Sequence, residues 1–136
     1  MKTLAYFLFC CFFVTSELMA QTDAEPQPTV TGFDCPKYPL DAASMCLQGT
    51  VKLQVTTDGH NVVNAKLVSG HPVLAHAAMK NVQTWKFAET SPTTFAVTYV
   101  YADEGIYKPN PVTKCSAKME LPTHVTVSTK FQAPCQ

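Results

Sequence analysis

The sequence predicts an α+β fold, a two-layer domain in which one main helix covers an antiparallel sheet. Three observations support this prediction. Residues 49–68 contain two stretches in which apolar and polar side chains alternate, the pattern of half-buried strands. Residues 72–85 repeat apolar side chains at intervals of three and four, as in a helix that covers a sheet. Alternation returns in residues 94–101, which predicts a third strand.

The first two strands form a predicted hairpin that reverses at Asp58-Gly59. This dipeptide is a strong turn signal because both residues tolerate the backbone angles of a tight reversal. Along each strand, one set of alternating side chains is apolar and is predicted to be the buried face. These residues are Val51, Leu53 and Val55 on the first strand and Val63, Ala65 and Leu67 on the second.

The main helix is predicted to begin at Gly70-His71-Pro72. Proline suits the first helical position because its missing N–H is not needed there, and we interpret His71 as a residue of the helix cap. The stripe that covers the sheet consists of Leu74, Ala77, Ala78, Val82 and Trp85. Because Trp85 continues this stripe, we interpret it as a core anchor rather than as a ligand-stacking residue.

Shorter elements are predicted on both sides of this unit. Pro39 begins a short N-terminal helix that ends at Gln48-Gly49. At the other end, an extra C-terminal strand pair is expected over Thr113–Leu121 and Thr123–Phe131, with Pro122 in the turn.

The third strand of the unit has an aromatic face. Phe95, Val97, Tyr99 and Tyr101 lie on one side of it, which we predict to be the inner side. The tyrosine hydroxyls are expected to reach the rim of the core. Tyr38 is expected to pack against the entry helix.

The first twenty residues have the pattern of a secretory signal peptide. Lys2 supplies positive charge, and the apolar run Leu4–Val14 is short for a bilayer-spanning helix. We therefore expect cleavage after Ala20 and export to the periplasm of a Gram-negative bacterium. The alternative is an inner-membrane anchor through residues 4–19.

The predicted organisation has three parts: a signal peptide at 1–20, a flexible N-terminal lead at 21–32 and a single domain at 33–136. Within the domain, the core spans 36–101 and the extra strands span 113–131. The lead is polar and contains prolines, and the domain has the length of one ordinary globular unit.

The charge balance excludes some classes of partner. The chain has ten basic and ten acidic residues, and none of the basic residues is an arginine. Nucleic-acid binding depends on clustered cations, so a neutral domain without arginine argues against that partner and against an anionic membrane surface.

The cysteines predict disulfides. Of the six cysteines, Cys10 and Cys11 belong to the signal, which leaves an even number in an exported domain. Three pairings of the remaining cysteines are open, and proximity in sequence favours Cys35–Cys46 and Cys115–Cys135.

No residue pattern predicts catalysis or metal binding. The four histidines are His60, His71, His76 and His124, and no pair of them has the spacing of a helical zinc motif. Ser69 lacks the glycine-flanked turn of a hydrolase nucleophile. We therefore expect neither an enzyme nor a cofactor.

Several short motifs together resemble the C-terminal domain of the energy transducer TonB. The agreement in order and spacing covers residues 36–101, about half of the chain. The motifs are Tyr38-Pro39, Gly49-Thr50-Val51, Asp58-Gly59, Val68-Ser69-Gly70-His71-Pro72-Val73-Leu74, Ala77-Ala78 and Trp85-Lys86-Phe87.

This resemblance implies a two-layer periplasmic domain, often dimeric, that binds the N-terminal segment of TonB-dependent outer-membrane transporters. In the family, the peptide adds as a strand to the segment that matches residues 94–101. The apolar run near the N-terminus contains neither the serine nor the histidine through which transducers couple to their motor complex. We therefore expect a binding module rather than a force-transmitting transducer.

The expected site is backbone rather than side chain. An exposed sheet edge binds an extended peptide by strand addition, here at the third strand or at the outer edge of the terminal strand pair. The candidate edge consists of Thr94, Phe95, Ala96, Val97, Thr98, Tyr99, Val100 and Tyr101. The alternatives are an accessory or structural domain without transducer activity, and an exported metal-binding protein or enzyme.

Overall fold

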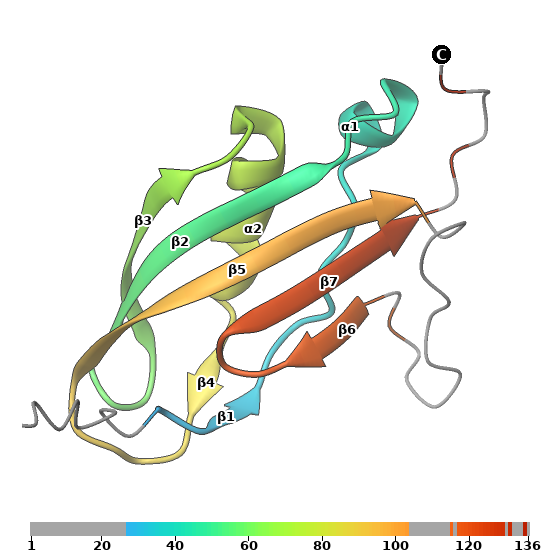
Figure 1. Ribbon diagram of the computed structural model, residues 1–136. Helices are drawn as coiled ribbons and strands as arrows, with labels where there is room; N and C mark the ends of the chain where they lie inside the picture. Colours follow the sequence, from blue (N-terminus) through green and yellow to red (C-terminus); the bar gives the residue numbers. More distant parts are fainter. Residues whose placement is uncertain (1–26, 104–114, 116, 130, 132–134, 136) are drawn as a thin grey trace, which may run out of the picture.

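The computed structural model describes residues 27–103, 117–129, 115, 131 and 135 (Figure 1). The predicted signal peptide and the first half of the predicted lead, residues 21–26, lie outside the described residues. The described part of the chain has the predicted two-layer α+β architecture, with a five-stranded sheet in the order β3-β2-β5-β7-β6 and helix α2 across one face.

The hairpin and the main helix form as the sequence predicts. Strand β2 (Gly49–Thr57) pairs antiparallel with β3 (Val62–Ser69), and β2 also pairs antiparallel with β5 (Thr93–Asp103) along nine residues. Helix α2 (Pro72–Val82) lies between β3 and β5 in the chain, and the short helix α1 (Leu40–Ser44) precedes β2.

Two turns depend on particular residues. At the hairpin turn, the Asp58 carboxylate accepts the backbone N–H groups of Asn61 (2.8 Å) and His60 (2.9 Å), and these bonds lower the pKa of the Asp58 carboxyl. Gly59 has a φ of +106°, and a Cβ there would lie 2.2 Å from the carbonyl oxygen of Thr90. At the start of α2, the ring Nδ1 of His71 accepts the N–H of Val73 (3.3 Å), which confirms the cap role of His71.

The core lies between the sheet and α2. The residues predicted from alternation on β2 and β5 and from the helical stripe lie in this core, except that Ala77 and Phe95 are only partly buried and pack against it. Buried apolar residues of these elements and of the segment after α2 are Val51, Leu53, Val55, Leu74, Ala75, Ala78, Val82, Trp85, Phe87, Val97, Tyr99 and Tyr101. The interpretation of Trp85 as a core anchor is confirmed, since none of its surface is exposed.

Strand β3 is less buried than predicted. Val63 is 60% exposed and Leu67 is 38% exposed, because β3 is the edge strand of the sheet. The β2–β3 ladder also shifts register at two places, between Lys52 and Leu53 and between Thr56 and Thr57. Each shift displaces the alternation by one residue.

The C-terminal strands pair in an order that the sequence did not predict. Strand β7 (His124–Thr129) lies next to β5 and runs parallel to it, while β6 (Ala117–Glu120) lies outside and pairs antiparallel with β7. The second strand of the hairpin lies inside because it supplies the buried valines, Val125 and Val127. The sheet is therefore antiparallel except at β5–β7.

The N-terminal region contains an additional strand. Val30–Gly32, which the composition assigns to a flexible lead, forms β1 and pairs antiparallel with β4 (Lys86–Phe87). Phe87 directly follows the helix exit and is buried. Backbone pairing with this exit positions the segment, since Val30 pairs with Phe87 and packs against the core, and the Ala88 N–H donates to the Thr29 carbonyl oxygen (2.9 Å).

The disulfide pairing favoured by proximity in sequence is wrong. The bonds are Cys35–Cys115 and Cys46–Cys135, with sequence separations of 80 and 89 residues. The physical reason is packing of the N-terminal segment against the end of the sheet: the Tyr38 ring lies 5.4 Å from that of Tyr101 and 5.9 Å from that of Phe131. Folding thus brings Cys35 and Cys46 beside the C-terminal segment.

Candidate functional site

The predicted binding edge on β5 is only partly accessible. Residues Thr98–Tyr101 pair with β2 on one side, and residues Thr98–Asp103 pair with β7 on the other. The first part of the strand, Thr93–Val97, pairs with β2 alone among the described residues. We call Thr93–Val97 the open half-edge. The other predicted residues, Thr98–Tyr101, are already inside the sheet.

The backbone of the open half-edge can accept another strand. The N–H of Thr98 donates to the carbonyl oxygen of Thr123 (2.8 Å), so the backbone groups of even-numbered residues point toward the β7 side. By the alternation of strand backbones, the N–H and C=O groups of Thr94 and Ala96 point to the same side. Both residues are exposed. The half-edge therefore presents two donors and two acceptors in the register of a missing strand.

The other two edges of the described sheet carry features that disfavour strand addition. Strand β3 is irregular, because its pairing with β2 shifts register at two places, and it carries the charged side chain of Lys66. The outer edge of β6 is four residues long and carries a salt bridge between Lys118 and Glu120, which lowers the pKa of Glu120. Bulges, charges and shortness are the devices by which natural sheets protect their edges. The half-edge on β5 is also short, but it carries no charged residue and its pairing with β2 has no register shift.

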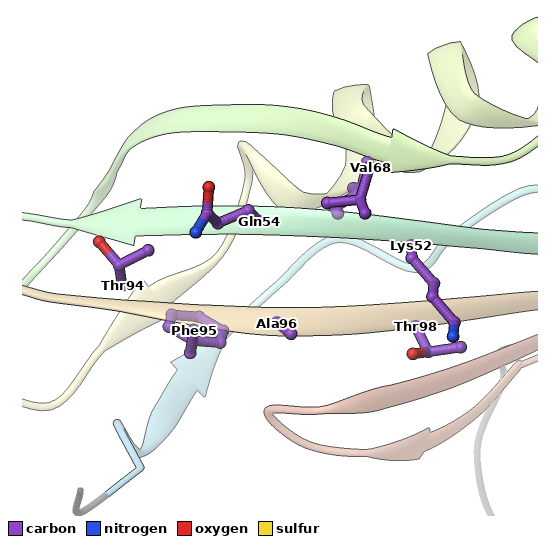
Figure 2. Close-up of a pocket in the computed structure, with 8 residues that line it drawn as sticks. Lys52, Gln54, Val68, Thr94, Phe95, Ala96 and Thr98 are labelled. Atoms are coloured by element: carbon purple, nitrogen blue, oxygen red, sulfur yellow. The ribbon is translucent and has the colours of Figure 1, made fainter.

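A shallow hollow of about 320 Å³ lies beside the half-edge, on the sheet face opposite α2 (Figure 2). Its lining includes side chains from β2, β3 and β5, and it contains one cation and no acid. The lining residues are Lys52, Leu53, Gln54, Val68, Thr94, Phe95, Ala96 and Thr98. Figure 2 shows the terminal nitrogen of Lys52 beside Thr98.

A buried polar cluster holds β5 in place from the other face. The Asn81 side-chain oxygen accepts the Tyr99 hydroxyl (2.8 Å) and the Trp85 ring N–H (3.4 Å), and its amide nitrogen donates to the carbonyl oxygen of Asp34 (2.8 Å). Asn81 is 8% exposed. One side chain of α2 thus connects the sheet, the helix exit and the N-terminal segment.

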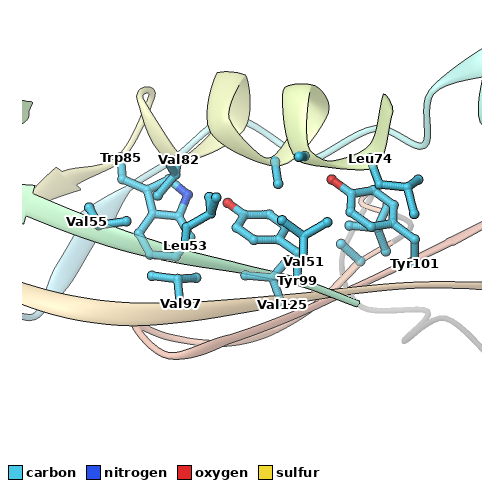
Figure 3. Close-up of a cluster of buried hydrophobic side chains, with 14 of the residues drawn as sticks. Val51, Leu53, Val55, Leu74, Val82, Trp85, Val97, Tyr99, Tyr101 and Val125 are labelled. Carbon is cyan, nitrogen blue, oxygen red and sulfur yellow. The ribbon is translucent and has the colours of Figure 1, made fainter. Parts of the chain in front are cut away.

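The tyrosine hydroxyls do not reach the rim as predicted. Tyr99 is fully buried and Tyr101 is 1% exposed (Figure 3). Burial raises the pKa of both phenols; Tyr101 adds to the upward shift of Tyr99, and Tyr38 adds to that of Tyr101. Burial, with a smaller effect of Asp103, also raises the pKa of Tyr38 to about 12. The Tyr101 hydroxyl has no hydrogen-bond partner among the described residues.

The described residues contain no group of three histidine, cysteine or carboxylate side chains that could hold a metal ion. His60 lies in the hairpin turn and His71 caps α2, while His76 is exposed on α2 and His124 begins β7. The structure does not bring them together at a shared site. In the described part of the chain, no helix is long and apolar enough to cross a membrane.

Comparison with known families agrees with this geometry. The family described as Gram-negative bacterial TonB protein C-terminal matches residues 34–102, half of the 136-residue chain. The chain therefore belongs to this family, whose members are non-enzymatic protein-interaction domains linked to TonB-dependent transport in the periplasm. The match ends within β5, so β6 and β7 lie beyond it. No curated protein gives a significant match.

Sequence reasoning missed two residues of the site. Asn81 occupies the apolar stripe of α2, four positions before Trp85, and a polar residue at such a position was a usable signal. In the sequence, Lys52 is one of the polar residues that alternate with Val51 and Leu53. Its place at the end of the open half-edge depends on where β7 begins to pair with β5, which alternation cannot show.

Proposed function

We propose that this protein is an exported, disulfide-bonded module that binds an extended partner peptide by β-strand addition at the open half-edge Thr93–Val97. The partner class is the N-terminal segment of a TonB-dependent outer-membrane transporter. Export follows from the signal pattern, with cleavage after Ala20. The observation that carries the proposal is the pair of outward-pointing, exposed backbone positions at Thr94 and Ala96.

The physical argument is that outward backbone hydrogen-bonding groups of the half-edge have no partner strand among the described residues. Backbone N–H and C=O groups at a sheet edge are bonded only to water, and an extended peptide can replace that water in register. The half-edge is uncharged, since its residues are Thr93, Thr94, Phe95, Ala96 and Val97. The Phe95 ring packs edge-on against the Phe87 ring, with a centroid distance of 5.8 Å, and this contact helps to hold the half-edge in place.

The direct test is titration of isotope-labelled protein with synthetic transporter N-terminal segments, followed by backbone amide shifts. We expect the largest shifts at Thr94 and Ala96. Shifts confined to β3 or β6 would place the binding site on another edge. If no segment shifts any edge strand, the transporter-peptide function is wrong.

A matched pair of variants at one position tests strand addition itself. Ala96→Pro removes the outward N–H, whereas Ala96→Val keeps it and adds a side chain that strands tolerate. We expect Pro to weaken peptide binding at least several-fold and Val to leave it nearly unchanged. Trp85 fluorescence checks that both variants remain folded. Equal binding by both variants would contradict a backbone-mediated contact.

Export has its own measurement. Intact mass spectrometry of protein recovered from a periplasmic fraction should give a chain that starts at Gln21. A chain that retains residues 1–20 would instead favour an inner-membrane anchor.

A further inference from the structure

One charged side chain lies at the end of the open half-edge. Lys52 on β2 is the cross-strand neighbour of Thr98 on β5, and Thr98 is the first residue of β5 that pairs with β7. Lys52 and Thr98 share the sheet face opposite α2, and Figure 2 shows the ammonium nitrogen of Lys52 beside Thr98. The cation therefore lies where the last residue of an added strand would meet the β6–β7 turn.

The charge of Lys52 is not balanced locally. The lining of the adjacent hollow contains no carboxylate. Within the described part of the chain, the one salt bridge joins Lys118 to Glu120, and no acid pairs with Lys52. The half-edge itself is neutral. A strand added there would meet uncharged residues along its length and Lys52 at one end. The same cross-strand row continues from Thr98 to His124 and Glu120, and the Glu120 carboxylate is paired with Lys118.

We propose that the partner peptide carries a carboxylate at the end that meets Thr98, and that Lys52 binds it. This inference rests on the proposed function and specifies the chemistry of the peptide. The carboxylate has two possible positions in the peptide. In a peptide parallel to β5 it belongs to an acidic side chain near the C-terminal end. In an antiparallel peptide it belongs to an acidic side chain near the N-terminal end.

The expected effect is modest because the ion pair is exposed to water. Exposed lysine–carboxylate pairs change an equilibrium about two- to five-fold, and salt screens them. Lys52 thus selects among peptides and fixes their direction, while the backbone ladder supplies most of the binding.

The experiment uses defined probes on the whole mature chain with both disulfides formed. The neutral probe is an acetylated, amidated Val-Thr-Val-Thr-Val peptide with one Gln added at each end. One acidic probe replaces the N-terminal Gln by Glu, and the other replaces the C-terminal Gln by Glu. Each is titrated into the unaltered protein, into Lys52→Gln, and into the control Lys66→Gln, which removes a cation from the neighbouring strand on the same sheet.

We expect one acidic arrangement to bind about two- to five-fold more tightly than the neutral probe, with the advantage lost in Lys52→Gln and at high salt. Lys66→Gln should retain the advantage. The preferred end identifies the direction of the peptide. Equal binding of neutral and acidic probes, with amide shifts at Thr94 and Ala96, would overturn the role of Lys52 and leave the proposed function intact. Absence of these shifts with every probe would instead count against strand addition itself.

Discussion

At the scale of single residues, two neighbouring tyrosines of β5 differ in one hydrogen bond. Tyr99 and Tyr101 are both buried, and their rings stack at a centroid distance of 6.3 Å. The Tyr99 hydroxyl donates to Asn81, whereas the Tyr101 hydroxyl has no partner among the described residues. A buried hydroxyl without a partner costs free energy, while a bonded one contributes to stability.

This difference predicts opposite effects of the same substitution. Tyr99→Phe should lower the free energy of unfolding by about 1 kcal/mol, because the Asn81 oxygen loses its shorter hydrogen bond. Tyr101→Phe should leave it unchanged or raise it by up to about 1 kcal/mol. Denaturant unfolding followed by Trp85 fluorescence measures both. Equal losses in the two variants would show that the Tyr101 hydroxyl has a partner.

The buried phenols also predict how stability responds to alkali. Burial raises the folded-state pKa of Tyr99 and Tyr101, and that of Tyr38 to about 12, above the value of about 10 expected in the unfolded chain. The unfolded state therefore releases these protons first. Their contribution to stability is complete below about pH 10 and is lost as the pH rises through the folded-state values.

The measurement compares two signals during alkaline titration. Tyrosinate absorbance from the buried phenols should appear at the same pH at which Trp85 fluorescence changes to that of the unfolded chain. In Tyr38→Phe, the part of the absorbance that appears above about pH 10 should be smaller. If the buried phenols ionise at ordinary pH while the fold persists, their burial is not as described.

At the scale of elements, the β2–β3 turn depends on a glycine. Gly59→Ala places a Cβ 2.2 Å from the Thr90 carbonyl oxygen and forces alanine into a φ of +106°. We expect a loss of at least about 2 kcal/mol of unfolding free energy. Gly32→Ala is the control, since its Cβ would meet nothing closer than 3.7 Å. Similar stabilities of the two variants would contradict the packing of this turn against the loop before β5.

The elements that the sequence predicts are those with local periodicity. Strand β2, helix α2 and the inner face of β5 follow from alternation and helical spacing, because burial of one face dictates those patterns. Strand β1 and the parallel pairing of β5 with β7 are not locally encoded. They depend on Phe87 and on Val125, which contact partners distant in sequence. The candidate site shares this property, since only the position of β7 decides which half of β5 stays open.

At the scale of the whole molecule, the two cystines connect the beginning of the domain to its end. Each closes a loop of 80 or more residues, and restriction of so long a loop in the unfolded chain contributes roughly 4–5 kcal/mol in the chain-entropy account. The terminal strands β6 and β7, which lie beyond the family match, are thus covalently attached on both sides.

Peptide mapping without reduction tests the pairing. We expect fragments that join Cys35 to Cys115 and Cys46 to Cys135. Replacing Cys35 and Cys115 together by serine should lower the free energy of unfolding by about 2–5 kcal/mol. Fragments that join Cys35 to Cys46 would contradict the packing of the N-terminal segment against the end of the sheet.

The shortness of the open half-edge sets the lifetime of any complex formed there. Only Thr94 and Ala96 direct backbone groups outward, which allows about four hydrogen bonds of roughly 0.5–1.5 kcal/mol each. The middle of this range corresponds to a Kd on the order of millimolar before the cost of ordering the peptide is subtracted, so these bonds alone give weak binding. One such contact dissociates rapidly, so a partner is retained only when tethered nearby or held at several sites at once. The protein would then bind and release its partners in fast exchange and would not form a long-lived complex with any one of them.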